Sequence, residues 1–542
     1  MSNEWNSIKS YICKNIWAIL LITAAVFLCH GSLLFSDRFG IDTEFIMSGV
    51  HNFNSLGRQG LVWLGQLLGL EWFNLYYAQA LVILFLILAP VSFGYLFCKA
   101  GGKESCALPL FLFGLSFVIS PFWTAQIYFL NQSPQVLFSC VLIPVIILLA
   151  EKARSTFFQK WYYVVIAVTL MQPVFSCYQV LIMIYVTAIA ATFLLSTFKS
   201  KRTVREQLLW ILYHASVFLC GFLIYLIISN LFFLDGTDYL QSQIWWNLME
   251  TSEAARLCLD TLRGLCGNNP PYTTGLYPYF ALLLLIITFY QLSGKKQKWT
   301  GTAFLFILVE FFIIAVPSVF ILIYGGLIPD RMQLLLPFSQ GCILYLIAFM
   351  VPVKENVHET IIKLWGRRIF TLFFAVLLWK DFSTQLSYCN RLYYTDEWRY
   401  QYDKELAGDI YSKLLALQNS GDYNSSLFLK TVFLGRPELP YNDTCMKGHV
   451  MGVSEFAFDA WEKTMYRPRI VYFMSQLGYP LEQYFSEEDE ALFFESFQKD
   501  FGALVDAMPC YPSDNYIQVL SDEGTGQEYL IIKLSEDWWG WD

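Results

Sequence analysis

A short polar segment between the first two hydrophobic stretches carries the side chains best suited to chemistry. It covers residues 36–74, and its candidate residues are Asp37, Asp42, Glu44, Arg38 and Arg58. A carboxylate can act as a general base or bind a divalent cation, and the planar guanidinium of arginine can hold a phosphate. Charges this close to a membrane span need water or a polar site around them, so the segment predicts a functional loop.

The same acids also fit an ordinary structural role. Asp42 is a good N-cap for a helix that begins near Thr43, and Glu44 is favoured in the first turn of such a helix. Side chains two residues apart do not share a helix face, so Asp42 and Glu44 converge only if the backbone there is not helical. The sequence leaves both roles open.

A second polar loop, PFWTAQIYFLNQS, combines aromatic rings with amides. Its candidate residues are Trp123, Gln126, Tyr128 and Asn131. Aromatic faces and amide groups together suit the apolar faces and hydroxyls of a sugar. The competing interpretation is a belt of aromatic residues at the membrane interface.

Two further turns carry polar residues. The SCYQ turn contains Tyr178 and Gln179, which either line a polar site or cap helix ends. The PDR turn contains Arg331. This residue binds an anion such as pyrophosphate, forms a local ion pair with Asp330, or extends its charged end to the membrane interface. Glu310 and His214 lie inside apolar stretches and are functional candidates or hydrogen-bonded structural residues.

The elements that position these residues are membrane spans. The chain has 542 residues, of which 56% are hydrophobic and only 15% are charged, whereas about a quarter of the residues in a soluble domain are charged. Eleven apolar stretches come near the roughly 20 residues needed to cross a bilayer. They cover about residues 15–35, 75–97, 105–123, 134–150, 161–177, 179–197, 208–232, 275–293, 300–323, 334–352 and 367–382.

The basic residues of the connecting loops predict the orientation. One alternate set of loops holds 18 lysines and arginines, whereas the other set holds only Arg38, Arg58, Arg256, Arg263 and Arg331. Basic loops stay in the cytoplasm, so we expect a cytoplasmic N-terminus and an outward-facing loop 36–74. The SCYQ turn, the PDR turn and the segment 233–274 fall on the same outer side.

The C-terminal part of the chain differs in composition. Residues 381–542 hold 12 basic against 27 acidic residues and no further apolar span. Helical periodicity over Asp403 to Leu417 and strand-like runs at Ser426–Phe433, Tyr516–Leu520 and Glu528–Lys533 predict an extracytoplasmic α+β domain. We therefore expect a membrane domain over residues 1–382 and a second domain over 383–542. The acidity argues against a nucleic-acid partner.

The chain contains neither GxxxxGK[ST] nor GxGxxG for nucleotide phosphates, and it has no large cytoplasmic loop. Transfer chemistry would then take place on the outer face, where nucleotide donors are scarce. This favours a donor that is carried by a lipid in the bilayer.

Four short motifs resemble those of a known family. The acidic SDRFGIDTE after the first span, GRQGL at Gly57 to Leu61, and the SCYQ and PDR turns are similar to those of the bacterial glucosyltransferase-domain membrane proteins. This group is typified by serotype-converting phage O-antigen glucosyltransferases of the GT-C superfamily, and the resemblance covers roughly residues 15–380. Members commonly have two adjacent aspartates in the first loop, whereas here the acids are spread over Asp37, Asp42 and Glu44.

The resemblance implies a multi-pass bacterial membrane enzyme with a GT-C-like fold. It would move a hexose, typically glucose, from a polyprenyl-phosphate donor to a cell-surface polysaccharide. A first-loop acid would be catalytic, Arg58, Arg331 and Arg38 would hold the lipid phosphate, and the aromatic loop and SCYQ turn would bind sugar. Whether a divalent cation (Mg or Mn) binds at Asp42 and Glu44 stays open.

Two other functions are compatible with the sequence. A transporter or flippase of lipid-linked glycans would place charges along several spans, where only Glu310 and His214 occur. A glycan polymerase or ligase would also act outside, but it tends to rely on arginines in large outer loops, and the outer loops here hold only five basic residues.

Overall fold

The computed structural model describes residues 2–49, 57–154, 157–199, 203–232, 244–294, 301–351, 361–420, 430–458, 467–481, 487–521 and 528–538. Their contacts divide the chain into two compact units. One, called the membrane unit below, comprises Met1–Ser36 and Asn52–Asn390, and the other, called the second unit, comprises Asp37–His51 and Arg391–Asp542. Part of the first loop therefore packs within the second unit.

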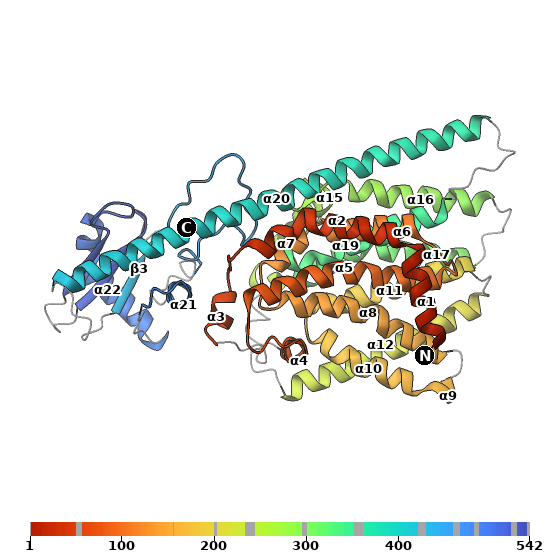
Figure 1. Cartoon of the computed structure of the whole chain (residues 1–542), viewed down its shortest axis with the longest axis horizontal. Coiled ribbons are helices and arrows are strands. Elements are labelled where there is room, and N and C mark those ends of the chain that lie inside the picture. Colours follow the sequence, from red (N-terminus) through yellow and green to blue (C-terminus); the bar gives the residue numbers. More distant parts are fainter. Residues whose placement is uncertain are drawn as a thin grey trace. The chain divides into compact units, whose positions relative to one another are not determined.

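The membrane unit is a bundle of helices (Figure 1). Its first half contains α1 (Ser2–Lys14), α2 (Ile16–His30), η1 (Gly31–Phe35), α4 (Gln59–Leu67), α5 (Leu75–Ala100), α6 (Ala107–Val118), α7 (Pro121–Ile127), α8 (Ser133–Arg154), α9 (Phe157–Lys160), α10 (Tyr162–Phe175) and α11 (Val180–Lys199). Its second half contains α12 (Val204–Phe232), α14 (Trp245–Leu248), α15 (Thr251–Cys266), the short strands β1 (Asn268–Asn269) and β2 (Thr273–Thr274), α16 (Tyr277–Gly294), α17 (Gly301–Ala315), η2 (Val316–Ser318), α18 (Val319–Tyr324), η3 (Asp330–Leu334), α19 (Leu335–Met350) and the first part of α20 (Ile361–Ser420).

Every apolar stretch that the sequence singled out falls on a helix. Among the described residues, eight helices are long and apolar enough to cross a membrane, and the bent pair α6–α7 raises this number to nine. The two other stretches form shorter apolar helices, Tyr162–Phe175 and Tyr277–Leu292. The chain is thus a multi-pass membrane protein, and the count of eleven crossings and the GT-C-like arrangement stay predictions.

Two prolines shape the end of the bundle that carries the polar turns. Pro121 opens α7, whose axis bends by 52° from that of α6. Pro173 lies near the end of α10, just before the SCYQ turn, as expected for a residue that lacks a backbone donor. These breaks place short polar segments at the ends of long apolar helices.

Aromatic residues fill the interior of the bundle around α19. The Phe338 ring lies 4.8 Å from the Phe93 ring and 5.7 Å from the Phe113 ring, measured between centroids. Offset and edge-on contacts of this kind add to the free energy gained by burying the rings. The α19 helix is therefore the central element against which α5 and α6 pack.

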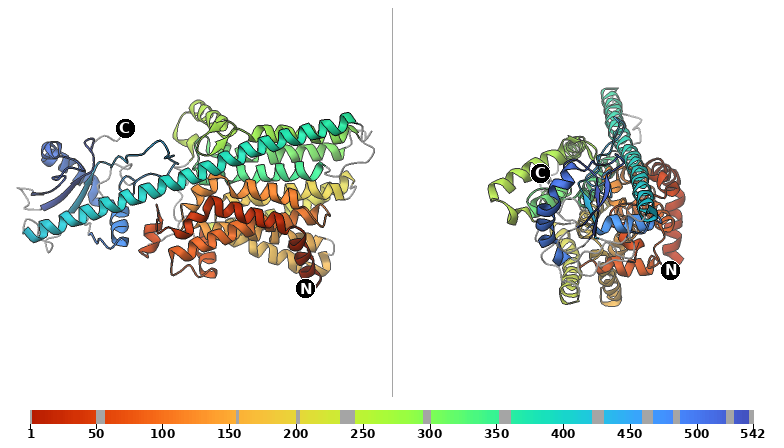
Figure 2. Two further views of the ribbon diagram at one scale, coloured as in Figure 1. Left: turned by 45° about the horizontal axis from the view of Figure 1, so that its top comes forward. Right: turned by 90° about the vertical axis from the view of Figure 1, so that its left-hand side faces the viewer.

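The second unit contains helices and a small sheet, and it includes Asp37–His51 as well as the C-terminal residues from Arg391 onward. Its three-stranded sheet has the order β3–β5–β4, with β3 (Lys430–Leu434) parallel to β5 (Glu528–Lys533) and β4 (Ile517–Ser521) antiparallel to β5. The helix α22 (Glu487–Ala507) covers the sheet, and its Phe497, Phe501 and Val505 share one hydrophobic core with Val432 and Ile531. The unit also contains α3 (Thr43–Met47), α21 (Pro468–Gln476) and the second part of α20 (Figure 2).

The long helix α20 corrects one detail of the sequence interpretation. The predicted last span and the periodic segment Asp403 to Leu417 belong to one helix of 60 residues. The apolar pattern alone could not show this, because polar residues continue the helix where the hydrophobic stretch ends. The start of the predicted strand at Ser426 lies outside the described residues, whereas its end coincides with β3.

Candidate functional site

The two acids of the first loop converge on one arginine in the second unit. Asp42 directly precedes α3 and has a left-handed backbone (φ 68°), the only such non-glycine residue described. Its carboxylate does not cap the helix, and its Oδ1 accepts a hydrogen bond of 2.9 Å from Nη1 of Arg469. The same nitrogen donates to Oε1 of Glu44 at 2.8 Å. The helix starts where predicted, but the turn at Asp42 brings the two carboxylates together.

Left-handed conformations are uncommon for residues other than glycine, although aspartate adopts them more readily than most. Such local strain persists where surrounding contacts enforce it, and it concentrates at functional sites. At Asp42 the contact with Arg469 takes the place of the ordinary capping bond. In the structure Asp42 is therefore not a simple N-cap, and a functional role of the two acids stays a prediction.

The helix α21 positions Arg469. Pro468 stands at its start, and α21 packs against α3 through the Phe45 and Tyr472 rings, whose centroids are 5.1 Å apart. The Arg469 guanidinium also lies 4.7 Å from the centroid of the Phe45 ring. Sequence reasoning missed this arginine, although the RPR run that contains it is unusual in so acidic a region.

A second buried carboxyl, Glu455, lies near Glu44. Its Oε1 accepts a hydrogen bond of 3.3 Å from Nη1 of Arg399, and both side chains are fully buried. Within the described part of the chain, Oε2 of Glu44 and Oε2 of Glu455 have no hydrogen-bond partner. Each carboxyl thus has one oxygen on an arginine and one oxygen available for a ligand, a water molecule or a proton.

The surroundings of these carboxyls favour their neutral forms. Burial raises the pKa of Glu44, Arg469 lowers it, the charge of Asp42 raises it, and the result is a pKa of about 7. Burial also raises the pKa of Glu455 well above its ordinary value, and the charge of Glu44 contributes to this increase. A carboxyl that titrates near neutrality is suited to accept a proton during a reaction.

Arg38 and Asp37, which precede these acids in the loop, have different partners. Arg38 is buried and forms ion pairs with Asp396 at 3.3 Å and Glu397 at 3.2 Å. The Asp37 side chain is 54% exposed and lies 3.4 Å from Nζ of Lys404. The structure therefore does not bring Asp37 into the group formed by Asp42, Glu44 and Arg469. In Arg38, the guanidinium nitrogens that a phosphate would need already bind the carboxylates of Asp396 and Glu397.

A second polar group forms in the membrane unit, where three of the motifs meet. Gly60 of GRQGL packs tightly on the SCYQ turn, because a Cβ atom there would lie 2.2 Å from the carbonyl oxygen of Pro173 and 2.5 Å from the nitrogen of Cys177. This close approach places the Arg58 guanidinium 5.5 Å from the centroid of the Tyr178 ring. Only glycine permits such a contact between backbones.

Arg331 of the PDR turn joins the same group. Its guanidinium lies 3.8 Å from the centroid of the Phe129 ring. Burial raises the pKa of Tyr178, and the charges of Arg331 and Arg58 both act to lower it. We call Arg58, Tyr178 and Arg331 the arginine–tyrosine cluster.

The aromatic loop is buried beside this cluster. Trp123 and Gln126 belong to α7, and Tyr128 and Asn131 follow it directly; all four are buried. An interfacial belt would expose such rings to lipid, so that alternative does not fit. Gln179 is partly exposed at the start of α11.

Several polar atoms of this region lack a partner. Within the described residues, Nε1 of Trp123, both amide atoms of Gln126 and Nη1 of Arg331 are buried without a hydrogen bond. Buried polar groups are nearly always hydrogen-bonded in folded proteins. These atoms therefore call for water or a polar ligand, which fits the predicted sugar and phosphate contacts.

The intramembrane candidates have structural partners. The hydroxyl of Thr288 donates to Oε1 of Glu310 at 3.0 Å, and Nε2 of His214 lies 2.8 Å from Oε1 of Glu151. Oε2 of Glu310 and Nδ1 of His214 have no partner among the described residues, so the functional and structural alternatives both stay predictions. In the described part of the chain, no group of three or more His, Cys, Asp or Glu residues could hold a metal ion.

More than half of the chain matches a known protein family. Residues 31–351 match the family model described as "Glucosyl transferase GtrII". Neither the curated proteins nor the solved structures contain a match. The family match includes the loop with Asp42 and Glu44 and all three motifs of the arginine–tyrosine cluster. Since it covers more than half of the chain, the protein belongs to the GtrII glucosyl transferase family and is a multi-pass membrane glucosyltransferase.

Proposed function

We propose that the protein transfers glucose from a polyprenyl-phosphate-linked donor to a cell-surface polysaccharide on the outer face of the membrane. The observation that carries this proposal is the buried Glu44 carboxyl, which has one oxygen on Arg469 and the other without a partner among the described residues. Such a group has both the position of a general base and a pKa close to neutrality. Glu44 is therefore our candidate for the residue that activates the acceptor.

The reaction requires one proton transfer and one exchange of bonds. The acceptor hydroxyl gives its proton to Glu44, and its oxygen forms a bond to C1 of the glucose. The bond between C1 and the phosphate oxygen breaks, and its electron pair leaves with the polyprenyl phosphate. Arg469 holds the Glu44 carboxylate in place before transfer, and Asp42 balances the charge of Arg469.

The leaving phosphate needs positive charge. The sequence predicts this role for Arg58 and Arg331. Within the membrane unit both guanidinium groups act on Tyr178, and Nη1 of Arg331 is buried without a hydrogen bond among the described residues, which supports the prediction. Charge-assisted bonds from arginine to phosphate are strong and directional. The neighbouring Gln126 and Trp123 offer unpaired donors and acceptors to the sugar hydroxyls.

The outer location rests on the distribution of basic residues in the loops. A donor outside the cytoplasm has to arrive with the membrane, because soluble nucleotide sugars are scarce there. The absence of nucleotide-phosphate motifs from the sequence supports the same choice of donor.

The direct test compares donors with the purified protein in lipid vesicles. Polyprenyl-phosphate-glucose, other polyprenyl-phosphate hexoses and a nucleotide-activated glucose are each offered with a bacterial surface polysaccharide, and glucose incorporation is measured. We expect incorporation only from the lipid-linked glucose. Transfer from the nucleotide donor, or no transfer from any lipid-linked sugar, would contradict the proposal.

The rate should depend on pH through Glu44. Protonated Glu44 cannot accept a proton, so the rate should rise with pH to a half-maximum near 7, where the pKa lies, and fall about tenfold per unit well below it. Replacing Asp42 by Asn removes a negative charge that raises this pKa, so the midpoint should move to lower pH. Initial rates between pH 5 and 9 measure both profiles. A midpoint that is the same in the two proteins would argue against Glu44.

Arg331 should act on donor binding. We expect Arg331→Gln to raise the KM for polyprenyl-phosphate-glucose by at least about tenfold, the effect of losing one charged hydrogen bond to a phosphate. Arg256→Gln is the matched control, since Arg256 is an exposed residue of the predicted outer set. Equal KM values for Arg331→Gln and the control would remove Arg331 from the donor site.

A further inference from the structure

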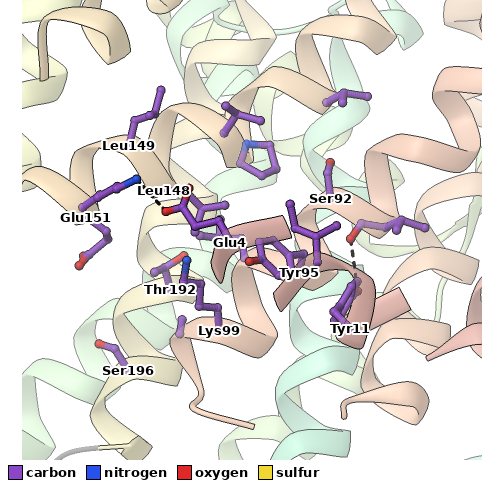
Figure 3. A pocket seen from close by; sticks show the side chains of 18 of the residues that line it. Glu4, Tyr11, Ser92, Tyr95, Lys99, Leu148, Leu149, Glu151, Thr192 and Ser196 are labelled. Carbon is purple, nitrogen blue, oxygen red and sulfur yellow. Dashed lines mark hydrogen bonds and ion pairs between the residues drawn. The ribbon is translucent and has the colours of Figure 1, made fainter. Parts of the chain in front are cut away.

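The membrane unit contains a large cavity at the end opposite to α4 and α7 (Figures 1 and 3). Its volume is about 970 Å³, and its walls come from α1, α5, α8, α10 and α11. A volume of this order is at the upper end of the range for sites that bind small molecules. Neither the reaction nor the two polar groups described above use this cavity.

One part of the cavity is apolar. Ile8 and Ile12 of α1, Leu88 of α5, and Val145 and Leu148 of α8 line it. Ile12, Leu88 and Val145 are still exposed in the folded chain. In a bilayer, an apolar surface of this kind is covered by hydrocarbon, so the walls suit an acyl chain.

The other part is basic. Lys99, Lys152, Arg154 and Lys199 line the cavity together with only two acids, Glu4 and Glu151. Figure 3 shows Lys99 of α5 and Glu4 of α1 among the lining side chains. The acids already have partners, because Glu4 lies 2.8 Å from Nζ of Lys152 and Glu151 lies 3.2 Å from Nε of Arg154.

Two lysines remain available for an anion. Lys99 and Lys199 are exposed and form no ion pair in the described part of the chain. They come from the ends of α5 and α11, so the fold brings together cations that are 100 residues apart in the sequence. Both belong to the loops that the excess of basic residues assigns to the cytoplasmic surface, where anionic phospholipid headgroups are found.

We propose that this cavity binds an anionic diacyl phospholipid, with the headgroup phosphate on Lys99 and Lys199 and an acyl chain along Ile12, Leu88 and Val145. Charge complementarity selects the occupant. A free phosphate would use only the basic part, and a zwitterionic lipid would bring its own cation toward the lysines. Basic pockets between membrane helices are known to hold anionic lipid headgroups. The site is separate from the donor site, and it does not depend on the proposed reaction.

Native mass spectrometry of the full-length protein in detergent tests the proposal. Phosphatidylglycerol, phosphatidylcholine and inorganic phosphate are titrated separately, and the bound fraction is measured for each. We expect phosphatidylglycerol to bind, phosphatidylcholine to bind much more weakly, and phosphate alone not to be retained. Equal binding of the two lipids, or retention of phosphate alone, would overturn the proposal.

Matched variants locate the site. Lys99→Gln with Lys199→Gln should weaken phosphatidylglycerol binding about 30-fold, the effect expected for two lysines near a lipid headgroup. Lys9→Gln is the control, because Lys9 is exposed on α1 and does not line the cavity. Lys99→Arg with Lys199→Arg keeps both charges and should bind like the wild type, which separates loss of charge from misfolding. Unchanged binding by the double Gln variant, or equal losses in the Lys9 control, would refute the site.

Discussion

Replacing Glu44 by Gln should lower the rate of glucosyl transfer by about 10²- to 10⁴-fold, the usual contribution of a positioned general base. The amide of glutamine keeps the size of the side chain and can still accept a hydrogen bond from Arg469. It cannot accept the proton of the acceptor hydroxyl. The rate constant at saturating polyprenyl-phosphate-glucose and polysaccharide is the quantity to measure.

Asp37→Asn is the control for this experiment. Asp37 lies in the same loop and loses the same charge, but its side chain is exposed and interacts with Lys404. We expect it to retain most of the wild-type rate. A Glu44→Gln enzyme as active as the control would leave the family assignment intact and would transfer the role of base to another group. A large loss in Asp37→Asn with little loss in Glu44→Gln would reverse our assignment within the loop.

Replacing Arg399 by Met should destabilise the second unit by about 3–5 kcal/mol, the typical result of breaking a fully buried ion pair from one side. Arg399 is completely buried and lies 2.8 Å from Asp396, 3.4 Å from Asp403 and 3.3 Å from Glu455. Among the described residues, its loss would leave the buried Asp403 and Glu455 without an ion-pair partner, whereas Asp396 would keep Arg38. Methionine fills a similar volume, so the change tests charge rather than packing.

Hydrogen exchange of the β3–β5 amides in the full-length protein measures this destabilisation. Arg263→Met is a matched control, because Arg263 forms an ion pair of the same helical spacing with Asp260 at 2.9 Å, but on an exposed surface. Exposed pairs contribute little to stability, so the exchange rates in this control should stay close to those of the wild type. Equal protection of the sheet in the two variants would show that the buried charges do not hold the second unit together.

The same charges explain how the first loop is held in the second unit. Asp396 binds both Arg38 of the loop and Arg399 of α20, and Nη2 of Arg399 donates to the carbonyl oxygen of Phe39 at 3.0 Å. Arg38 and Phe39, which make these contacts, precede Asp42 by only a few residues. Arg38 therefore positions the loop that carries the candidate base, which differs from the phosphate-binding role expected from the sequence.

The sequence by itself determined the class of the protein. Hydrophobic length depends on consecutive residues, so each apolar stretch could be read directly and each falls on a helix. The short motifs in the loops were sufficient to identify the family, whereas the catalytic role of the loop with Asp42 and Glu44 stays a prediction. The strands near Tyr516 and Glu528 were also visible, because alternating β-branched and aromatic residues are a local signal.

Only the tertiary structure decided which residues meet. Arg469 and Glu455 reach the first loop from more than 400 residues away, and neither has a local pattern that marks it. The left-handed turn at Asp42 also depends on its partner, since local preference alone favours an ordinary N-cap. Electrostatic contacts and burial act through space, and so the pKa of a carboxyl such as Glu44 follows from the fold and cannot be inferred from its neighbours in the chain.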